Sequence, residues 1–145
     1  MRWLSLDHGT KKIGLAFSDE LEILASPFEV WLQEEERTLV RLARLCKEEG
    51  VQALAVGLPR HKDGAESATA PAARAFGEAL AARTGLPVRF VNEHLSSAEA
   101  ERLLRERGVK PEKRKAMLDA AAAAVILSEL LEDRRAKGIP ATAMD

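Results

Sequence analysis

The chain is poor in cysteine and aromatic residues: among its 145 residues are one cysteine, no tyrosine, two tryptophans and four phenylalanines. The single cysteine, Cys46, excludes an internal disulfide and favours a reducing, cytoplasmic location. The three histidines, His8, His61 and His94, are scattered along the chain, so we expect no Cys/His zinc site. The longest wholly apolar run, residues 120–127, is too short to cross a bilayer, and we expect no membrane contact.

The charges nearly balance, with a net charge of −1, but they are unevenly distributed. Residues 19–36 contain seven acidic residues and no lysine or arginine, whereas residues 101–115 contain seven basic and three acidic residues. A basic stretch of this kind indicates either a local phosphate-binding patch or an ordinary solvated helix and loop. The overall composition, 46% hydrophobic and 31% charged, is typical of a globular domain of this length.

The hydrophobic pattern predicts an α/β fold in one domain, residues 1–137, followed by a disordered tail. We expect strands at residues 2–7, 12–18, 23–31, 51–58 and 87–92, and helices at 34–49, 67–84, 96–107 and 115–137. Short connections between the first three strands indicate an antiparallel meander, and Pro27 favours an edge position for the third. The later strand–helix–strand alternation predicts parallel crossovers. The expected architecture is therefore a mixed five-stranded sheet with helices on both faces.

Three acidic residues are candidates for a shared site. Asp7 ends the first predicted strand and Glu93 follows the last, so parallel strands would bring both carboxylates to the same end of the sheet. Either acid alone is better explained as a residue that simply closes a strand in a loop. Asp119 lies on a helical row with Ala123 and Ile126 that faces the protein, where a carboxylate is costly without a cation or hydrogen-bond donors. The alternative interpretation is that Asp119 is a boundary residue at the rim of the apolar stripe, without a role in a site.

Carboxylates that converge on one point repel each other unless a cation lies between them. Hard oxygen ligands of this type suit Mg²⁺ or Mn²⁺. A divalent ion held in this way can activate water and stabilise a leaving oxygen in phosphoryl chemistry. The pattern therefore predicts a metal-dependent hydrolase with Asp7, Glu93 and Asp119 as catalytic and metal-binding residues.

Four segments, in order and spanning nearly the whole chain, resemble the motifs of the YqgF family. They are Asp-His-Gly-Thr-Lys-Lys-Ile-Gly-Leu-Ala-Phe-Ser-Asp at 7–19, Val-Gly-Leu-Pro at 56–59 with Gly64 following, Val-Asn-Glu-His-Leu-Ser-Ser-Ala-Glu-Ala at 91–100, and Asp-Ala-Ala-Ala-Ala-Ala-Val-Ile-Leu at 119–127. These proteins are described as Holliday junction resolvase-like or as nucleases of pre-16S ribosomal RNA. The resemblance implies an RNase H-like fold, acids at Asp7, Glu93 and Asp119, a divalent metal and a nucleic-acid substrate.

The sequence departs from the family pattern at two places. The third motif usually reads Asp-Glu-Arg, and here it is Asn92-Glu93-His94, which lacks one carboxylate and one arginine that could contact phosphate. Lys12 replaces a common arginine of the first motif, which keeps the positive charge but loses the bidentate fork.

Basic residues near the acids are candidate contacts to the nucleic-acid backbone. They are Lys11, Lys12, Arg107, Lys110, Lys113, Arg114 and Lys115, with Arg105 in the same basic stretch. Lys115 lies one helical turn before Asp119 and could instead neutralise it. Solvated side chains are the alternative for all of them.

Of the functions compatible with this pattern, we favour metal-dependent processing of precursor 16S ribosomal RNA. A junction resolvase needs two sites in a two-fold dimer, and few large apolar residues are left over for an interface, so we expect a monomer, with a weak dimer as the alternative. Two further alternatives are an RNA-binding ribosome-assembly factor without rapid catalysis and a fragment of the sugar kinase–actin superfamily. Nothing in the sequence indicates the second phosphate loop that the kinase hypothesis needs.

Overall fold

The computed structural model describes residues 1–60, 65, 67–93 and 97–145. Its strands are β1 (Trp3–His8), β2 (Lys12–Ser18), β3 (Ala25–Leu32), β4 (Ala53–Pro59) and β5 (Val88–Glu93). Its helices are α1 (Glu36–Glu48), α2 (Ala70–Thr84), α3 (Ser97–Glu106) and α4 (Pro111–Ala136). The strands form one sheet in the order β3-β2-β1-β4-β5.

The predicted sheet is confirmed. The pairs β1–β2 and β2–β3 are antiparallel, and the pairs β1–β4 and β4–β5 are parallel. Strand β3 is an edge strand, as Pro27 indicated, and the register shifts beside Pro27, because β3 has one extra residue, Phe28, opposite the step from Leu15 to Ala16 in β2. The remaining boundaries agree with the expected ones to within a few residues.

One helix boundary was predicted wrongly. The last helix was expected from about Lys115, after a basic loop at 109–114, but α4 begins at Pro111. Proline is well suited to the first turn of a helix because its missing N–H has no partner there in any case. Residues 111–114 are therefore helical. The predicted capping box of α3 depends on Ser96, which lies outside the described residues.

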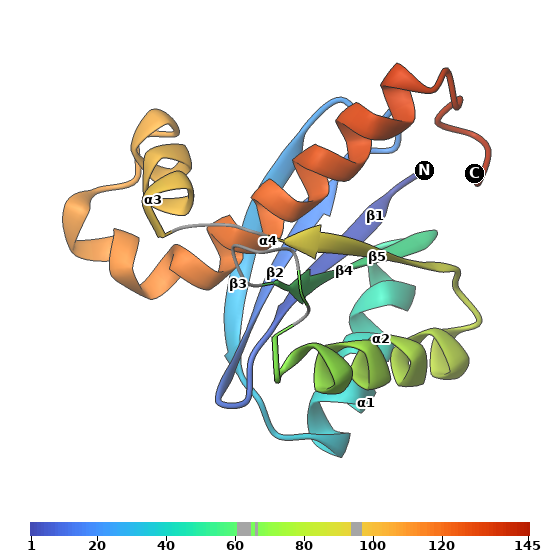
Figure 1. The fold of residues 1–145 in the computed structure, drawn as a ribbon, viewed down its shortest axis with the longest axis horizontal. Coiled ribbons are helices and arrows are strands. Elements are labelled where there is room, and N and C mark those ends of the chain that lie inside the picture. The colour runs from blue at the N-terminus through green and yellow to red at the C-terminus, as the bar shows by residue number, and fades with distance from the viewer. Residues whose placement is uncertain (61–64, 66, 94–96) are drawn as a thin grey trace.

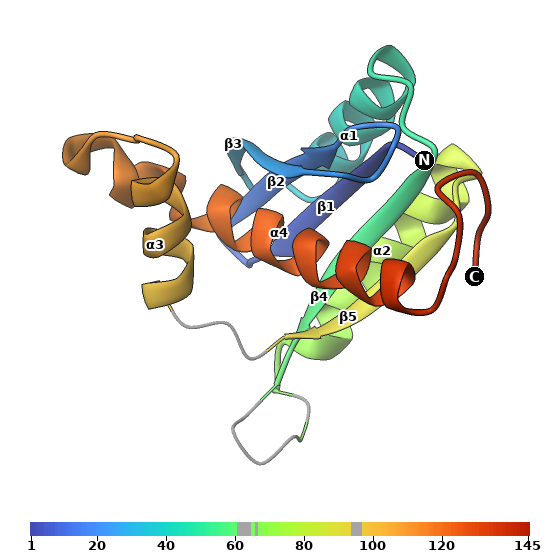
Figure 2. The same cartoon turned by 90° about the horizontal axis from the view of Figure 1, so that it is seen from above.

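Helices cover both faces of the sheet (Figure 1). Helices α1 and α2 lie on one face, and α4 crosses the other, as the second view also shows (Figure 2). Helix α3 lies away from the sheet and packs against α4 through Ala100, Leu104 and Ala121. In the described part of the chain, no helix is both long and apolar enough to cross a membrane.

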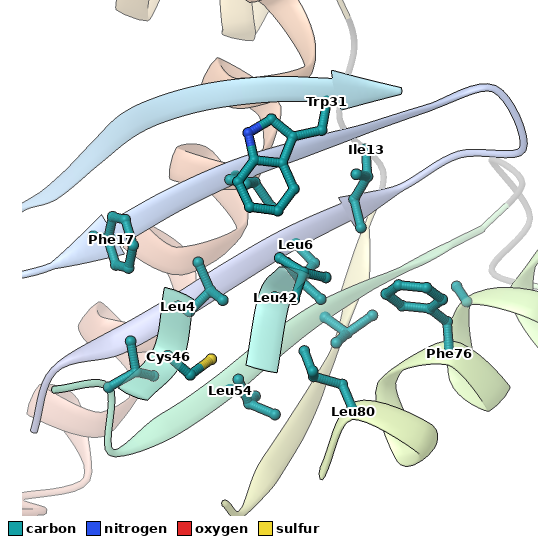
Figure 3. Close-up of a cluster of buried hydrophobic side chains, with 14 of the residues drawn as sticks. Leu4, Leu6, Ile13, Phe17, Trp31, Leu42, Cys46, Leu54, Phe76 and Leu80 are labelled. Carbon is teal, nitrogen blue, oxygen red and sulfur yellow. The ribbon is translucent and has the colours of Figure 1, made fainter. Parts of the chain in front are cut away.

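The core on the side of α1 and α2 is built from large side chains. Leu4 and Leu6 of β1 and Leu54 of β4 meet Leu42 of α1 and Leu80 of α2 (Figure 3). Cys46 is buried in the same cluster, and burial raises the pKa of its thiol to about 11. This environment is that of a structural rather than a reactive thiol.

The core on the side of α4 is built from small side chains. Ala123 and Ala124 of the helix pack against Ala16, Ala53 and Ala55 of the sheet. The Ser5 hydroxyl, fully buried in β1, donates a hydrogen bond of 2.7 Å to the carbonyl oxygen of Ala123. Small residues and this hydrogen bond hold the helix unusually close to the strands.

Gly14 of β2 marks the point of closest approach. A β-carbon placed on this residue would overlap the backbone carbonyl of Asp119 and approach the backbone nitrogen of Ala120 to 2.7 Å. Backbone atoms of a helix cannot move aside as a flexible side chain can. The absence of a side chain at Gly14 therefore lets α4 rest directly on β2.

The C-terminal segment, which was expected to be disordered, has partners in the structure. Arg134, 1% exposed, forms an ion pair of 2.7 Å with Glu22 and donates hydrogen bonds to the carbonyl oxygens of Pro140 and Ala143. Its guanidinium lies over the ring of Trp3. These contacts hold residues 138–145 beside the N-terminus, where both termini lie close together (Figure 1).

Replacing Gly14 with alanine should destabilise the fold by more than about 3 kcal/mol, because α4 would have to lift off the sheet. The measurement is urea unfolding of both proteins. Gly50→Ala is the matched control, since Gly50 has a positive φ of 65° and no atom within 4 Å of an added β-carbon. Its cost should be only about 1–2 kcal/mol. Equal losses in the two variants would contradict the close contact of α4 with β2 at Gly14.

Candidate active site

Asp7 reaches the site because β1 alternates between the two faces of the sheet. Trp3 and Ser5 face α4, so Asp7, two residues further, faces the same helix near the end of the strand. Its neighbour in the register with β2 is Gly14, the residue on which α4 rests. The first carboxylate thus lies where helix and sheet are closest.

Asp119 is held at this place by the packing of its own helix. Its backbone carbonyl lies against Gly14, and the Ser5–Ala123 hydrogen bond fixes the next turn of α4. The sequence prediction that this row faces the protein is confirmed, because Ala123 and Ile126 are fully buried.

Glu93 is the last residue of β5 and pairs with Pro59 at the end of β4. Its carboxylate extends across β4 toward the other two acids. Gly57 leaves the space for it, since a β-carbon at Gly57 would lie 3.0 Å from Glu93 Oε2 and 2.5 Å from Ile126 Cδ1. A side chain at Gly57 would therefore crowd both Glu93 and Ile126, although these side-chain atoms can move more easily than the helix backbone at Gly14.

The three predicted acids line one pocket of about 250 Å³. The other lining residues are Ser97, Ala100, Leu118 and Ala122. Helix α3 supplies two of these and forms one wall, a contribution that the sequence analysis missed. Its only sequence signal was the short distance in the chain between Ser97 and Glu93.

The electrostatics of the pocket favour protonated carboxyls in the absence of a cation. Burial, reinforced by the charge of Asp119, raises the pKa of Asp7 to about 7. Burial also raises the pKa of Glu93 to about 8, with further contributions from Asp7, Glu129 and Glu99. Among the described residues, no hydrogen bond or ion pair reaches the side-chain carboxylates of Asp7, Glu93 and Asp119.

The chemical type of the ligands suits a hard divalent cation, but the distances between the three carboxylates do not. Buried, mutually repelling carboxylates without a positive partner are the groups that Mg²⁺ or Mn²⁺ stabilises. Within the described residues, however, no three acidic, histidine or cysteine side chains are grouped closely enough to share one ion as they stand. The pairs that interact are Asp7 with Asp119 and Asp7 with Glu93.

The predicted phosphate contacts divide into two groups. Arg107 donates hydrogen bonds to Ser26 and to the carbonyl oxygen of Ala25, and Arg114 donates one to the carbonyl oxygen of Val109. These two arginines therefore also join α3 and α4 to their surroundings. The lysines of the set are all exposed: Lys11, Lys12, Lys110, Lys113 and Lys115. In the described part of the chain, no ion pair links Lys115 to Asp119.

The two residues that differ from the family motif flank Glu93. Asn92 is exposed and leaves β5 on the opposite face from Glu93, so an aspartate in its place would also point away from the pocket. His94 lies outside the described residues. The other histidine near the site, His8, follows Asp7 and stacks on Phe76 on the α1–α2 side.

Comparison with known proteins gives the family. Residues 1–133 match the model of a family described as "RuvX: Holliday junction resolvase". The chain belongs to this family. A relative from Anaeromyxobacter sp. is 44% identical over 137 residues, which cover 94% of this chain and all of that one. A relative from Lachnospira eligens is 39% identical over 93% of this chain and 99% of its own. Each is named "Putative pre-16S rRNA nuclease".

Solved structures support the fold. The RuvC structure of Thermus thermophilus aligns with a TM-score of 0.61 at 17% identity, over 94% of this chain and 97% of that one. A fowlpox virus Holliday junction resolvase aligns with a TM-score of 0.59 at 13% identity, over 92% and 99%. The RNase H-like α/β fold, which the resemblance to the YqgF motifs implied, is confirmed. The family is one of nucleases rather than sugar kinases.

The raised pKa values predict how stability depends on pH without metal. Folding raises both carboxyl pKa values above their ordinary values near 4, so the folded state binds more protons than the unfolded state between about pH 4 and pH 8. The free energy of unfolding should therefore fall as pH rises through this window. Asp7→Asn should remove much of the fall and stabilise the protein at pH 8.5 by on the order of 2 kcal/mol. Urea unfolding in chelator at several pH values measures this.

Asp133→Asn is the matched control, because Asp133 lies exposed near the end of the same helix, paired with Lys137. Its stability should change by less than about 1 kcal/mol at every pH. A parent protein whose stability rises between pH 5 and pH 8 would contradict the assignment of Asp7 and Glu93 as crowded, buried acids.

Proposed function

We propose that this RuvX-family protein is a metal-dependent nuclease that hydrolyses phosphodiester bonds of structured nucleic acid at the pocket of Asp7, Glu93 and Asp119. The observation that carries the proposal is the convergence of these carboxylates at one pocket, where the pKa values of Asp7 and Glu93 are raised and no described positive partner reaches any of the three acids. Such a site is unfavourable for folding and becomes favourable when a cation binds.

Each acid has a distinct place in the proposed chemistry. Asp7 interacts electrostatically with both Asp119 and Glu93, so it would hold a bound ion together with either of them. Glu93 and Asp119 would complete the ligand set from the two sides. Bound Mg²⁺ or Mn²⁺ would supply activation of water and stabilisation of the leaving oxygen. Small movements of the side chains must bring the three carboxylates together, since their spacing in the structure is too wide for one ion.

We propose precursor 16S ribosomal RNA as the substrate, because the relatives that match most of the chain are named for it. The name of the family favours a four-way DNA junction as the alternative. A resolvase needs two such pockets in a dimer. We propose a cytoplasmic monomer, which cuts one strand at a time. Tight, paired nicking of a DNA junction by a dimer would favour the alternative.

Cleavage should require Mn²⁺ or Mg²⁺ and should be lost in the variant Asp119→Asn, because removing one carboxylate weakens the ion. We expect a decrease of at least about 100-fold in the rate. The measurement is cleavage of labelled precursor RNA and of a four-way DNA junction, each with metal and with chelator.

The Asp133→Asn variant again serves as the control, since it makes the same chemical change on the same helix outside the pocket. It should cleave like the parent. If Asp119→Asn cleaves either substrate at the parental rate, the pocket is not the active site. If neither substrate is cleaved by the parent with any divalent ion, the protein binds RNA without catalysis.

The exposed lysines should contribute to binding by releasing counterions from the nucleic acid. Lys113→Glu should weaken RNA binding at every sequence and lower the slope of log K against log salt by roughly one unit. Lys113 is chosen because, unlike Arg114, it has no described structural partner. Lys47→Glu, on the last turn of α1, is the control and should leave the slope unchanged. Identical slopes for parent and Lys113→Glu would show that this stretch is only a solvated surface.

A further inference from the structure

A second pocket lies at the same end of the sheet as the carboxylates but on its opposite face. It measures about 350 Å³, within the range of sites for small planar ligands. Its lining comes from the β1–β2 turn, the β3–α1 connection, α1 and α2. The lining residues are His8, Gly9, Thr10, Gln33, Glu35, Leu39, Ala72, Ala75, Phe76 and Ala79.

We propose that this pocket binds one unpaired nucleobase of the substrate, a few nucleotides from the bond that is cut. The proposal rests on the nuclease function above for the identity of the substrate, and on the geometry of the pocket for the rest.

The position of the pocket connects it to the active site. Asp7 and His8 are consecutive residues of β1, so their side chains leave opposite faces of the same strand end. The turn at Gly9 and Thr10, together with exposed Lys11, then forms the rim between the two pockets. A strand whose phosphate lies at Asp7 has only this short turn to cross.

The inner surface of the pocket is suited to a flat, uncharged ring. The ring of Phe76 is buried and packs at a tilt of 43° against the partly exposed ring of His8, with centroids 4.9 Å apart, so the supported His8 ring offers an aromatic surface for stacking. On α2, Ala72, Ala75 and Ala79 are exposed and small, so nothing on that helix face obstructs a planar ligand.

The polar groups select a base rather than a phosphate. Glu35 is the one acidic residue among the described lining residues, and no lysine or arginine lines the pocket, so an anion would be repelled. The side chains of Thr10 and Gln33 offer hydrogen-bonding groups at the rim and wall. The amide nitrogen of Gln33 is buried and has no partner among the described residues, while its oxygen accepts the backbone N–H of Glu35. A buried donor without a partner is unfavourable, and an acceptor on a base could satisfy it.

The test fills the pocket without touching the active site. Ala75→Met places a larger side chain in the pocket from an exposed helix position, and Ala82→Met, two turns further along the same exposed helix, is the matched control outside it. Binding is measured in chelator, so that nothing is cut, with a partly unpaired RNA oligomer. The same oligomer is then tested with an abasic residue at each position in turn.

We expect one abasic position to weaken binding by the parent about fivefold or more, as for one stacked base. Ala75→Met should lose a similar factor with the intact oligomer and should no longer respond to that abasic position, while Ala82→Met should behave like the parent. Such non-additivity places the base at this pocket. Three results would overturn the proposal. Ala75→Met could bind like the parent, its loss of affinity could be equal with every oligomer, or the parent could bind none of the oligomers.

Cleavage with Mn²⁺, measured separately, distinguishes this proposal from the nuclease function. If cleavage requires Asp7 but Ala75→Met has no effect on binding, the base pocket is rejected and the nuclease function is kept. A position-specific effect of Ala75→Met without any cleavage would reject the nuclease and keep the pocket.

Discussion

The candidate site depends on the close contact of α4 with the sheet. Gly14 removes the side chain that would hold the helix away, and alanines on both surfaces let the backbones approach. The Ser5 hydrogen bond to Ala123 then fixes the helix along its axis. Asp119 meets Asp7 only because all these features act together, so the packing of this face and the geometry of the site are one property of the fold.

This packing works against the stability of the metal-free protein. Bringing Asp119 and Glu93 to Asp7 buries like charges, which is why the carboxyl pKa values of Asp7 and Glu93 rise so far. The other face of the sheet, filled with large aliphatic and aromatic side chains, carries no such charges and supplies much of the hydrophobic stabilisation. A fold can maintain a repulsive site when the rest of its core is well packed, and a cation that binds there returns the lost stability.

The sequence was sufficient for the sheet because each of its signals is local. Hydrophobic alternation, Pro27 at an edge and the strand–helix–strand order require no knowledge of distant contacts. The positions of Asp7 and Glu93 at strand ends followed from the same logic. Three features could not be predicted, because they depend on how helices pack on strands far away in the chain. They are the space at Gly57, the pocket wall that α3 contributes through Ser97, and the backbone partner of Arg107. The start of α4 was missed because the charges of residues 112–115 concealed the helical signal of Pro111.

Both pockets at the end of the sheet follow from the alternation of β1. One residue, Asp7, carries the charge on the α4 side, and the next, His8, adds an aromatic ring on the α1–α2 side. The three carboxylates make the first pocket acidic, whereas the alanines of α2 and a single acidic residue, Glu35, leave the second pocket almost uncharged. The proposed nuclease site needs carboxylates to hold a metal beside a phosphate, and the proposed base pocket needs a flat apolar surface, so the two faces of the sheet offer the two environments that a bound strand would require. In that binding mode, the β1–β2 turn between the pockets would set how far along the strand the bound base lies from the cut.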